Sequence, residues 1–183
     1  MSEAPAPATA FIVAVPEAEP LVSDLRARFD PSAALGVPAH VTVLHPFMPP
    51  AEVTPEVLER VAVALRGMRA FDFVLARVMR FPGVLYLAPE PAAPLVALTE
   101  ALIRAFPQYP PFGGAHERIV PHLTVAQGDE PMLQQAEAGL RATLQAHGPI
   151  HAPCRELCLL HNAPGSWVQW QRLPLHIEGA QVR

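Results

Sequence analysis

Two copies of one four-residue pattern constrain this chain more than any other feature. His40-Val41-Thr42-Val43 and His122-Leu123-Thr124-Val125 each place a histidine and a threonine two residues apart, with apolar residues between and after them. With 8 histidines and 6 threonines among 183 residues, chance alone gives about 0.3 His-x-Thr triplets. Side chains alternate between the two faces of a β-strand. Each tetrapeptide therefore predicts a strand with an imidazole and a hydroxyl on one face and apolar side chains on the other.

The surroundings of the two tetrapeptides also repeat, which indicates an internal duplication. The second histidine lies 82 residues after the first, and a Pro-Gly turn signal follows each histidine by 42 residues, at Pro82-Gly83 and at Pro164-Gly165. Each half has the predicted order strand, helix, histidine strand, helix, strand. One further strand is expected from Trp167 to Leu175.

Capping residues and hydrophobic spacing locate the other elements. A helix is predicted from Thr54 to Arg69, with Thr54 as its N-cap, and a second helix follows the N-cap Asp129. The β-rich runs after these helices, each expected to be one strand, are Phe71–Phe81 and Ile150–His161. Helices are expected to open at Pro20 and Pro94, and strands at 11–15 and 84–87.

Composition favours one globular α+β domain. The chain is 51% hydrophobic, which suffices for a sizeable core at this length. We expect a single domain over residues 9–178 with approximate halves 9–82 and 83–178, preceded by a mobile tail over residues 1–8. The sequence has no signal-peptide pattern and no run of 18 apolar residues. A cytoplasmic monomer without a membrane partner is therefore expected.

The absence of lysine excludes several mechanisms. All 13 basic residues are arginine, so a phosphate-binding Gly-Lys-Ser/Thr loop, a Schiff base and a lysine-adenylate intermediate are excluded. The formal net charge of −4 argues against a surface that follows duplex DNA, whereas a small phosphorylated ligand or an RNA end is compatible. The sequence also lacks the common dinucleotide, serine-hydrolase and zinc-protease motifs. We expect no cofactor.

Neither the cysteines nor the remaining histidines predict a redox or metal site. Cys154 and Cys158, four residues apart in an expected strand, would be separated by about 13 Å, too far for a disulfide. They are expected to be reduced core thiols. His147 and His151 flank Gly148-Pro149 and have no acidic companion, so no metal site is predicted.

Two histidines and two threonines suit phosphoryl chemistry. A neutral imidazole can accept a proton and a protonated one can donate it, because each pKa starts near neutrality. His40 and His122 are therefore the candidate acid and base. Thr42 and Thr124 could donate hydrogen bonds to the non-bridging oxygens of a phosphate.

These paired motifs in a duplicated chain resemble the two-histidine (2H) phosphoesterase superfamily, which includes the bacterial 2′-5′ RNA ligase (LigT-like) proteins. The resemblance covers residues 10–177. It implies two pseudo-twofold-related lobes whose mostly antiparallel sheets line a central cleft, with helices outside. It also implies hydrolysis of a 2′,3′-cyclic phosphodiester to a phosphomonoester, typically the 2′-phosphate, and in some members reversible 2′-5′ joining of RNA ends without ATP. By the same resemblance His122 is expected to be the base and His40 the acid. Where motif members often carry a basic residue, Pro38-Ala39 and Val120-Pro121 precede the two histidines here.

The stretch before His122 supplies further candidates for substrate binding. An aromatic side chain there could stack on a nucleobase and an arginine could approach a phosphate, although an ordinary solvated loop explains the same residues. The substrate-binding candidates are Tyr109, Phe112 and Arg118, with Gly113, Gly114 and His116 beside them. Strict alternation along the first motif places His45 on the face opposite His40, so His45 is expected to be structural.

Two functions fit these observations. The first is a metal-independent 2′,3′-cyclic phosphodiesterase that acts on cyclic nucleotides or RNA ends. The second is a nucleotide- or RNA-binding module that has kept the cleft but turns nothing over.

Overall fold

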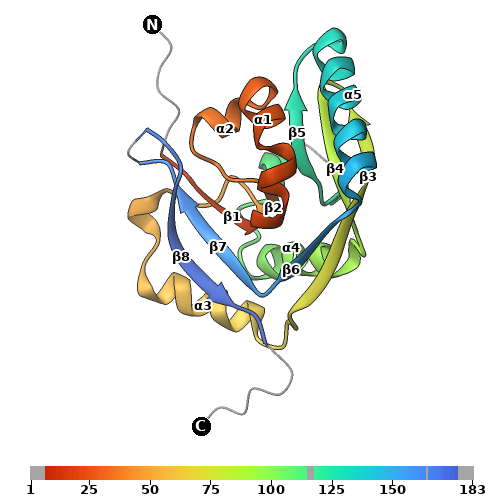
Figure 1. Ribbon diagram of the computed structural model, residues 1–183. Coiled ribbons are helices and arrows are strands. Elements are labelled where there is room, and N and C mark those ends of the chain that lie inside the picture. Colours follow the sequence, from red (N-terminus) through yellow and green to blue (C-terminus); the bar gives the residue numbers. More distant parts are fainter. Residues whose placement is uncertain (1–6, 115–117, 164, 177–183) are drawn as a thin grey trace, which may run out of the picture.

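The computed structural model describes residues 7–114, 118–163 and 165–176, which form two sheets and their surrounding helices (Figure 1). The strands are β1 (Thr9–Ala14), β2 (His40–Leu44), β3 (Phe71–Phe81), β4 (Val84–Glu90), β5 (Leu123–Gln127), β6 (Ile150–Cys154), β7 (Glu156–His161) and β8 (Val168–Pro174). The α-helices are α1 (Glu19–Phe29), α2 (Pro31–Ala34), α3 (Pro55–Leu65), α4 (Ala93–Ala105) and α5 (Glu130–His147). Short 3₁₀ turns lie at Pro16–Ala18, Pro50–Glu52 and Pro111–Gly114. This arrangement confirms the predicted α+β class.

The two sheets do not follow the two halves of the sequence. The first sheet has the strand order β2-β1-β7-β8 and the second has the order β5-β4-β3-β6, with antiparallel pairing between all neighbours. The chain crosses to the second sheet at β3 and returns at β7, so each sheet contains strands from both halves. Each sheet nevertheless carries one of the two histidine strands, β2 in the first and β5 in the second.

The prediction of one strand over Ile150–His161 is wrong. The segment divides at Arg155 into β6, which pairs with β3, and β7, which pairs with β1 in the other sheet. Arg155 holds the crossing point, because its guanidinium donates to the Phe71 carbonyl at 2.7 Å and its own carbonyl accepts from the Leu175 N–H at 2.8 Å. No Gly or Pro occupies the crossing residues 154–156, so no turn signal marks the crossing in the sequence.

Local signals were more reliable for the helix starts and the hairpin. Thr54 Oγ1 accepts a hydrogen bond from the Val57 N–H, and Asp129 Oδ1 accepts one from the Met132 N–H at 3.0 Å, which confirms both N-caps. The β3 strand has its predicted bounds, and Pro82-Gly83 forms the turn to β4 with Gly83 at φ 75°. The second turn signal includes Pro164, which lies outside the described residues.

The termini of the predicted domain are only partly described. Residues 1–6 of the expected tail and residues 177 and 178 lie outside the described residues. At the described end, the Ala8 N–H donates to Asn162 Oδ1 at 2.7 Å, which ties the start of β1 to the end of β7. None of the helices in the described ranges combines the length and apolar character needed to cross a lipid bilayer.

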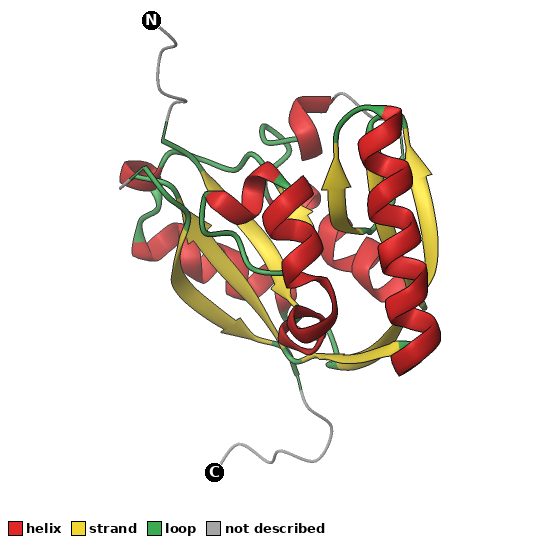
Figure 2. Cartoon of the chain, turned by 45° about the horizontal axis from the view of Figure 1, so that its top comes forward, coloured by secondary structure: helices red, strands yellow, loops and turns green. Residues whose placement is uncertain are grey.

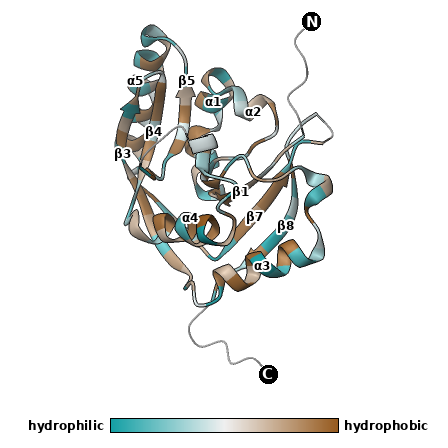
Figure 3. Cartoon of the chain, turned by 180° about the vertical axis from the view of Figure 1, so that it is seen from behind, coloured by the Kyte–Doolittle hydropathy of each residue, from teal (hydrophilic) through white to brown (hydrophobic). Residues whose placement is uncertain are grey.

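Helices cover the faces of the sheets that carry the core. The α5 helix lies along β3, β4 and β5 and also contacts α1 (Figure 2). Seen from behind, α3 and α4 lie next to each other, and β7 is largely hydrophobic (Figure 3). One continuous buried cluster joins the two sheets, with Phe11 and Leu157 from the first and Leu87 and Leu123 from the second. Both cysteines are free and buried, as predicted.

This shared core predicts a single unfolding transition. Leu157→Ala in β7 and Leu87→Ala in β4 should each lower the free energy of unfolding by about 2–5 kcal/mol, because each removes a fully buried side chain. In thermal unfolding followed by circular dichroism, both variants should shift one common transition. Met79→Ala, at a position 38% exposed, is the control and should cost little. Two transitions, only one of which responds to each substitution, would contradict a single domain.

Candidate active site

The first motif lies on β2, and a β-bulge follows its threonine. The register against β1 shifts so that Val43 is an extra residue between Thr42 and Leu44. Val43 and Leu44 are both buried, and alternation resumes with His45, which lines the same pocket as His40. The expectation that His45 lies on the opposite face is therefore wrong, because the bulge inserts one residue into the alternation.

The second motif contains the equivalent bulge on β5. The register against β4 shifts so that Val125 is the extra residue between Thr124 and Ala126. Val125 and Ala126 are both fully buried, and Gln127 follows as an exposed residue. Gln127 and His45 thus occupy equivalent positions, each five residues after a motif histidine. The duplication extends to this irregularity of the backbone.

Hydrogen bonds define the protonation of His40. Its Nδ1 lies 2.8 Å from the Pro38 carbonyl oxygen, and its Nε2 lies 3.1 Å from Thr42 Oγ1. Because a carbonyl only accepts, Nδ1 carries the proton and Nε2 accepts from the Thr42 hydroxyl. Burial lowers the pKa of His40 to about 4 from its ordinary value of 6.5, against the opposing effect of the Pro38 carbonyl. His40 is therefore neutral at neutral pH.

The second histidine has the same backbone partner but different surroundings. His122 Nδ1 lies 2.7 Å from the Val120 carbonyl oxygen, which favours the same tautomer as in His40. Aromatic rings surround it: the centroid of Phe81 lies 5.2 Å from that of His122, and the centroid of Tyr86 lies 5.4 Å away. Phe112 stacks on the imidazole at 6.4 Å. This histidine is thus oriented by ring contacts as well as by a carbonyl.

The fold brings the two motifs together although they belong to different sheets. Strands β2 and β5 contact each other, and the charge of His122 acts on His40 to lower its pKa. Phe112 links the two sides, because its N–H donates to the His45 carbonyl at 2.6 Å while its ring stacks on His122. The two motifs therefore lie in one region of the molecule.

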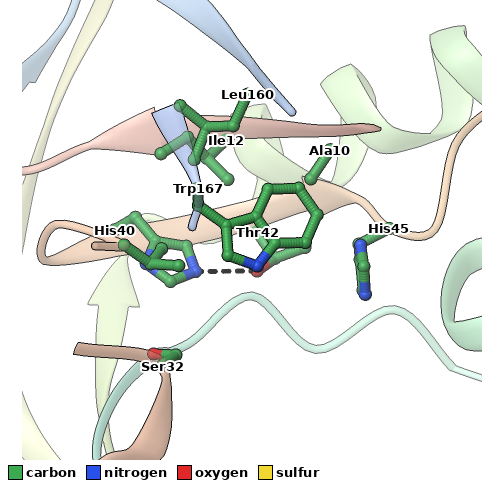
Figure 4. Close-up of a pocket in the computed structure, with 9 residues that line it drawn as sticks. Ala10, Ile12, Ser32, His40, Thr42, His45, Leu160 and Trp167 are labelled. Atoms are coloured by element: carbon green, nitrogen blue, oxygen red, sulfur yellow. Dashed lines mark hydrogen bonds between the residues drawn. The ribbon is translucent and has the colours of Figure 1, made fainter. Parts of the chain in front are cut away.

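A pocket opens beside His40 and Thr42 (Figure 4). The Trp167 ring meets the His45 ring edge-on, with centroids 5.5 Å apart. The turn after α2 holds Trp167 in place. The Trp167 N–H donates to the Leu35 carbonyl at 2.7 Å, and a Cβ on Gly36 would come within 2.9 Å of the Trp167 carbonyl oxygen. The pocket walls are mostly apolar, as in many ligand sites. The other lining residues are Ala10, Ile12, Ser32, Val37 and Leu160.

The remaining predicted binding residues lie elsewhere or are only partly described. Tyr109 packs on Phe47 with ring centroids 5.1 Å apart, and its hydroxyl donates to Glu52 at 3.4 Å. Burial, aided by Glu52, raises the pKa of Tyr109. Arg118 is exposed, and His116 lies outside the described residues. Of the rings around His122, sequence reasoning named only Phe112. It missed Phe81, Tyr86 and the pocket roles of His45 and Trp167, because no local pattern marks which distant strands meet.

No metal-binding cluster is found within the described ranges. These contain no group of three or more His, Cys, Asp or Glu side chains placed to hold an ion. His147 lies at the end of α5 with Nδ1 3.0 Å from the Thr143 carbonyl oxygen.

The lowered pKa of His40 predicts a pH-dependent stability. The unfolded chain takes up this proton near pH 6.5 and the folded chain only near pH 4. Stability should therefore fall as the pH drops from about 6.5 to 4, by at most about 3 kcal/mol and less where water reaches the ring. Chemical denaturation of wild type and His40→Gln across this range measures the effect, and the variant should lose less stability. His151→Gln, at an exposed position, is the control. Parallel curves for wild type and His40→Gln would show that His40 is not buried in its neutral form.

Comparison with solved structures finds proteins of similar fold. Escherichia coli LigT complexed with NADP+ is 18% identical, with 92% of this chain and 96% of that chain covered and a TM-score of 0.56. The same protein complexed with 3′-AMP is 16% identical, with coverage of 92% and 97% and a TM-score of 0.57. TT0787 of Thermus thermophilus is 18% identical, with coverage of 93% and 99% and a TM-score of 0.60. At these identities the likeness shows the fold.

Sequence comparisons give the family. No curated protein matches this chain. Residues 14–165, which include both motifs, match the family model described as the 2′-5′ RNA ligase superfamily. The match confirms the resemblance seen in the paired motifs, and the chain therefore belongs to the 2′-5′ RNA ligase superfamily.

Proposed function

We propose that this protein is a metal-independent 2′,3′-cyclic phosphodiesterase that acts on cyclic nucleotides or RNA ends. The product is a phosphomonoester, in this proposal the 2′-phosphate, and reversible 2′-5′ joining of RNA ends without ATP is a further activity of the same site. The observation that carries the proposal is the matched pair of imidazoles, each with Nδ1 on a backbone carbonyl and each two residues before a threonine. The cytoplasmic location and the monomeric state remain predictions from the sequence.

The ligands of the structural relatives support a nucleotide substrate. Escherichia coli LigT has been solved in complex with 3′-AMP and with NADP+, two phosphorylated nucleotides. A 2′,3′-cyclic phosphate has the same chemical parts, a ribose, a base and an anionic phosphorus centre. The mostly apolar pocket beside His40 and Thr42 adjoins the place where the phosphate would lie.

The chemistry needs two opposite proton transfers. The base takes a proton from water as the water oxygen attacks phosphorus, and the P–O bond to the 3′ oxygen breaks while the acid gives that oxygen a proton. Thr42 and Thr124 donate hydrogen bonds to the non-bridging oxygens. In the free protein the Thr42 hydroxyl points to His40 Nε2 at 3.1 Å, so turning it to the phosphate would free that nitrogen.

The protonation of His40 favours one assignment of the two roles. His40 is neutral in the free protein, since burial lowers its pKa to about 4. As the base it would act in its abundant form, whereas as the acid it would need a protonated form that is scarce at neutral pH. The protonation of His40 in the free protein thus favours His40 as the base and leaves His122 as the acid, whereas the resemblance implies the reverse order. A substrate with a good leaving group distinguishes the two.

The second candidate function is a nucleotide-binding module without turnover. Its support is the pocket itself, which can hold a ligand whether or not a reaction follows. The motif side chains would then serve binding alone, and substituting them would change affinity with no chemical step to measure.

Removal of either histidine should abolish turnover. We expect hydrolysis of 2′,3′-cyclic nucleotides in the presence of a chelator, and a loss of about 10² to 10⁴-fold in kcat for His40→Ala and for His122→Ala. Phosphomonoester formation measures the rate, and His151→Ala, at an exposed position on β6, is the matched control. Binding without any turnover by the wild type would favour the module, and full activity in either variant would refute the two-histidine mechanism.

A substrate with a good leaving group should identify the acid. A 2′-deoxynucleoside 4-nitrophenyl phosphodiester has no 2′ hydroxyl, so water attacks its phosphorus. It expels a phenolate that needs little protonation, so loss of the acid should matter less than loss of the base. We expect His122→Ala to recover most of its deficit on this substrate while His40→Ala does not, measured by release of nitrophenolate. Recovery in His40→Ala instead would restore the opposite assignment.

A further inference from the structure

Two side chains of α1, Glu19 and Arg26, form hydrogen bonds with the backbone just before the first motif. We call this pair the clamp. Arg26 Nη2 donates to the Val37 carbonyl oxygen at 3.0 Å, and Glu19 Oε1 accepts from the Ala39 N–H at 2.6 Å. Val37 and Ala39 are the two neighbours of Pro38, whose carbonyl accepts from His40 Nδ1. The backbone that sets the tautomer of His40 is therefore held on both sides.

The arginine of this clamp is itself fixed. Its side chain is 3% exposed and pairs with the buried Asp30 carboxylate, with Nε 3.1 Å and Nη2 3.0 Å from Oδ2. Asp30 Oδ1 accepts from the N–H and the hydroxyl of Ser32, at 3.0 and 2.8 Å, and from Gln127 Nε2 at 3.5 Å. The network thus runs from Arg26 of α1 to Asp30, and from Asp30 both to the pocket residue Ser32 and to Gln127 at the end of β5. A buried pair with so many partners has little freedom to move.

The glutamate completes the clamp from a more exposed position. Its side chain is 37% exposed, and the oxygen that accepts from the Ala39 N–H lies 4.0 Å from Arg26 Nη1. Ala39 is fully buried, so its N–H needs a protein partner. The carbonyl that serves His122 belongs to Val120, which is 44% exposed. The carbonyl that serves the first histidine is therefore held by a largely buried ionic network, whereas the carbonyl that serves the second belongs to an exposed residue.

We propose that Glu19, together with the buried Arg26, is a positioning residue for His40: it holds the peptide after Pro38 so that the Pro38 carbonyl keeps the proton on Nδ1 and leaves Nε2 for chemistry. The expected loss of kcat rests on the proposed function, whereas the expected change in the His40 tautomer rests on the geometry alone. Glu19 touches neither substrate nor reacting atoms and acts only through the backbone.

Glu19 offers a cleaner test than Arg26, because Arg26→Met would leave the Asp30 carboxylate buried without its cation. Glu19→Ala removes the acceptor for the Ala39 N–H, whereas Glu19→Gln keeps an oxygen in its place. We expect Glu19→Ala to lower kcat for cyclic nucleotide hydrolysis by about 10- to 100-fold with little change in KM, and Glu19→Gln to restore most of the rate. Glu130→Ala is the matched control, since Glu130 is the first residue of α5 as Glu19 is of α1.

Nuclear magnetic resonance of the ring nitrogens gives a readout that does not depend on activity. Long-range ¹⁵N–¹H spectra should show wild-type His40 with the proton on Nδ1 alone, Glu19→Ala with both tautomers, and Glu19→Gln and Glu130→Ala as in the wild type. An unchanged His40 tautomer in Glu19→Ala would overturn the proposal, as would a normal kcat in that variant. If the wild type hydrolyses no cyclic phosphate, the proposed function fails, and the spectra still decide the role of Glu19.

Discussion

Burial of the apolar faces of β2 and β5 is the interaction on which the site depends. Val41, Val43, Leu123 and Val125 are each at most 2% exposed and join one core that spans both sheets. Each such side chain contributes about 1.5–3 kcal/mol on burial. A slip of either strand by one residue would turn these side chains outward and the histidine and threonine inward. The same packing energy that stabilises the fold therefore points the reactive groups toward the site.

The two halves share their backbone geometry but not their electrostatics. Both motifs contain a bulge after the threonine and a histidine with Nδ1 on the carbonyl two residues earlier. His40, however, is desolvated and lies near the buried Arg26, both of which lower its pKa, whereas His122 lies among aromatic rings. A symmetric fold can thus hold two chemically different imidazoles, as opposite proton transfers require.

The basic side chains near the first motif are arranged differently from those of a usual phosphate site, in which lysine or arginine contacts the phosphate. The chain has no lysine, and Arg26, whose charge acts on His40, is paired with Asp30 in the interior. In the described structure its donors go to the Val37 backbone carbonyl and to the side chains of Asp30 and Ser32, so it holds the segment before the first motif. On the proposed function, hydroxyl donors and the histidine that gains a proton would carry much of the stabilisation of phosphate charge.

The sequence by itself determined the features that short segments encode. Neighbouring residues, whose propensities act locally, determine the N-caps Thr54 and Asp129, the extended run Phe71–Phe81 and the turn at Pro82-Gly83. The family likewise follows from the two motifs and their spacing.

Only the tertiary structure decided how these segments pair and what surrounds the reactive groups. Residues far apart are joined at the crossing at Arg155, at Trp167 beside the pocket and in the clamp from Glu19 and Arg26, and a register shift in β2 brings His45 to the pocket. Alternation cannot reveal a bulge, since one inserted residue leaves the sequence looking regular while it reverses the face that follows. The low pKa of His40 likewise arises from desolvation, which depends on everything packed around the ring and on no local pattern.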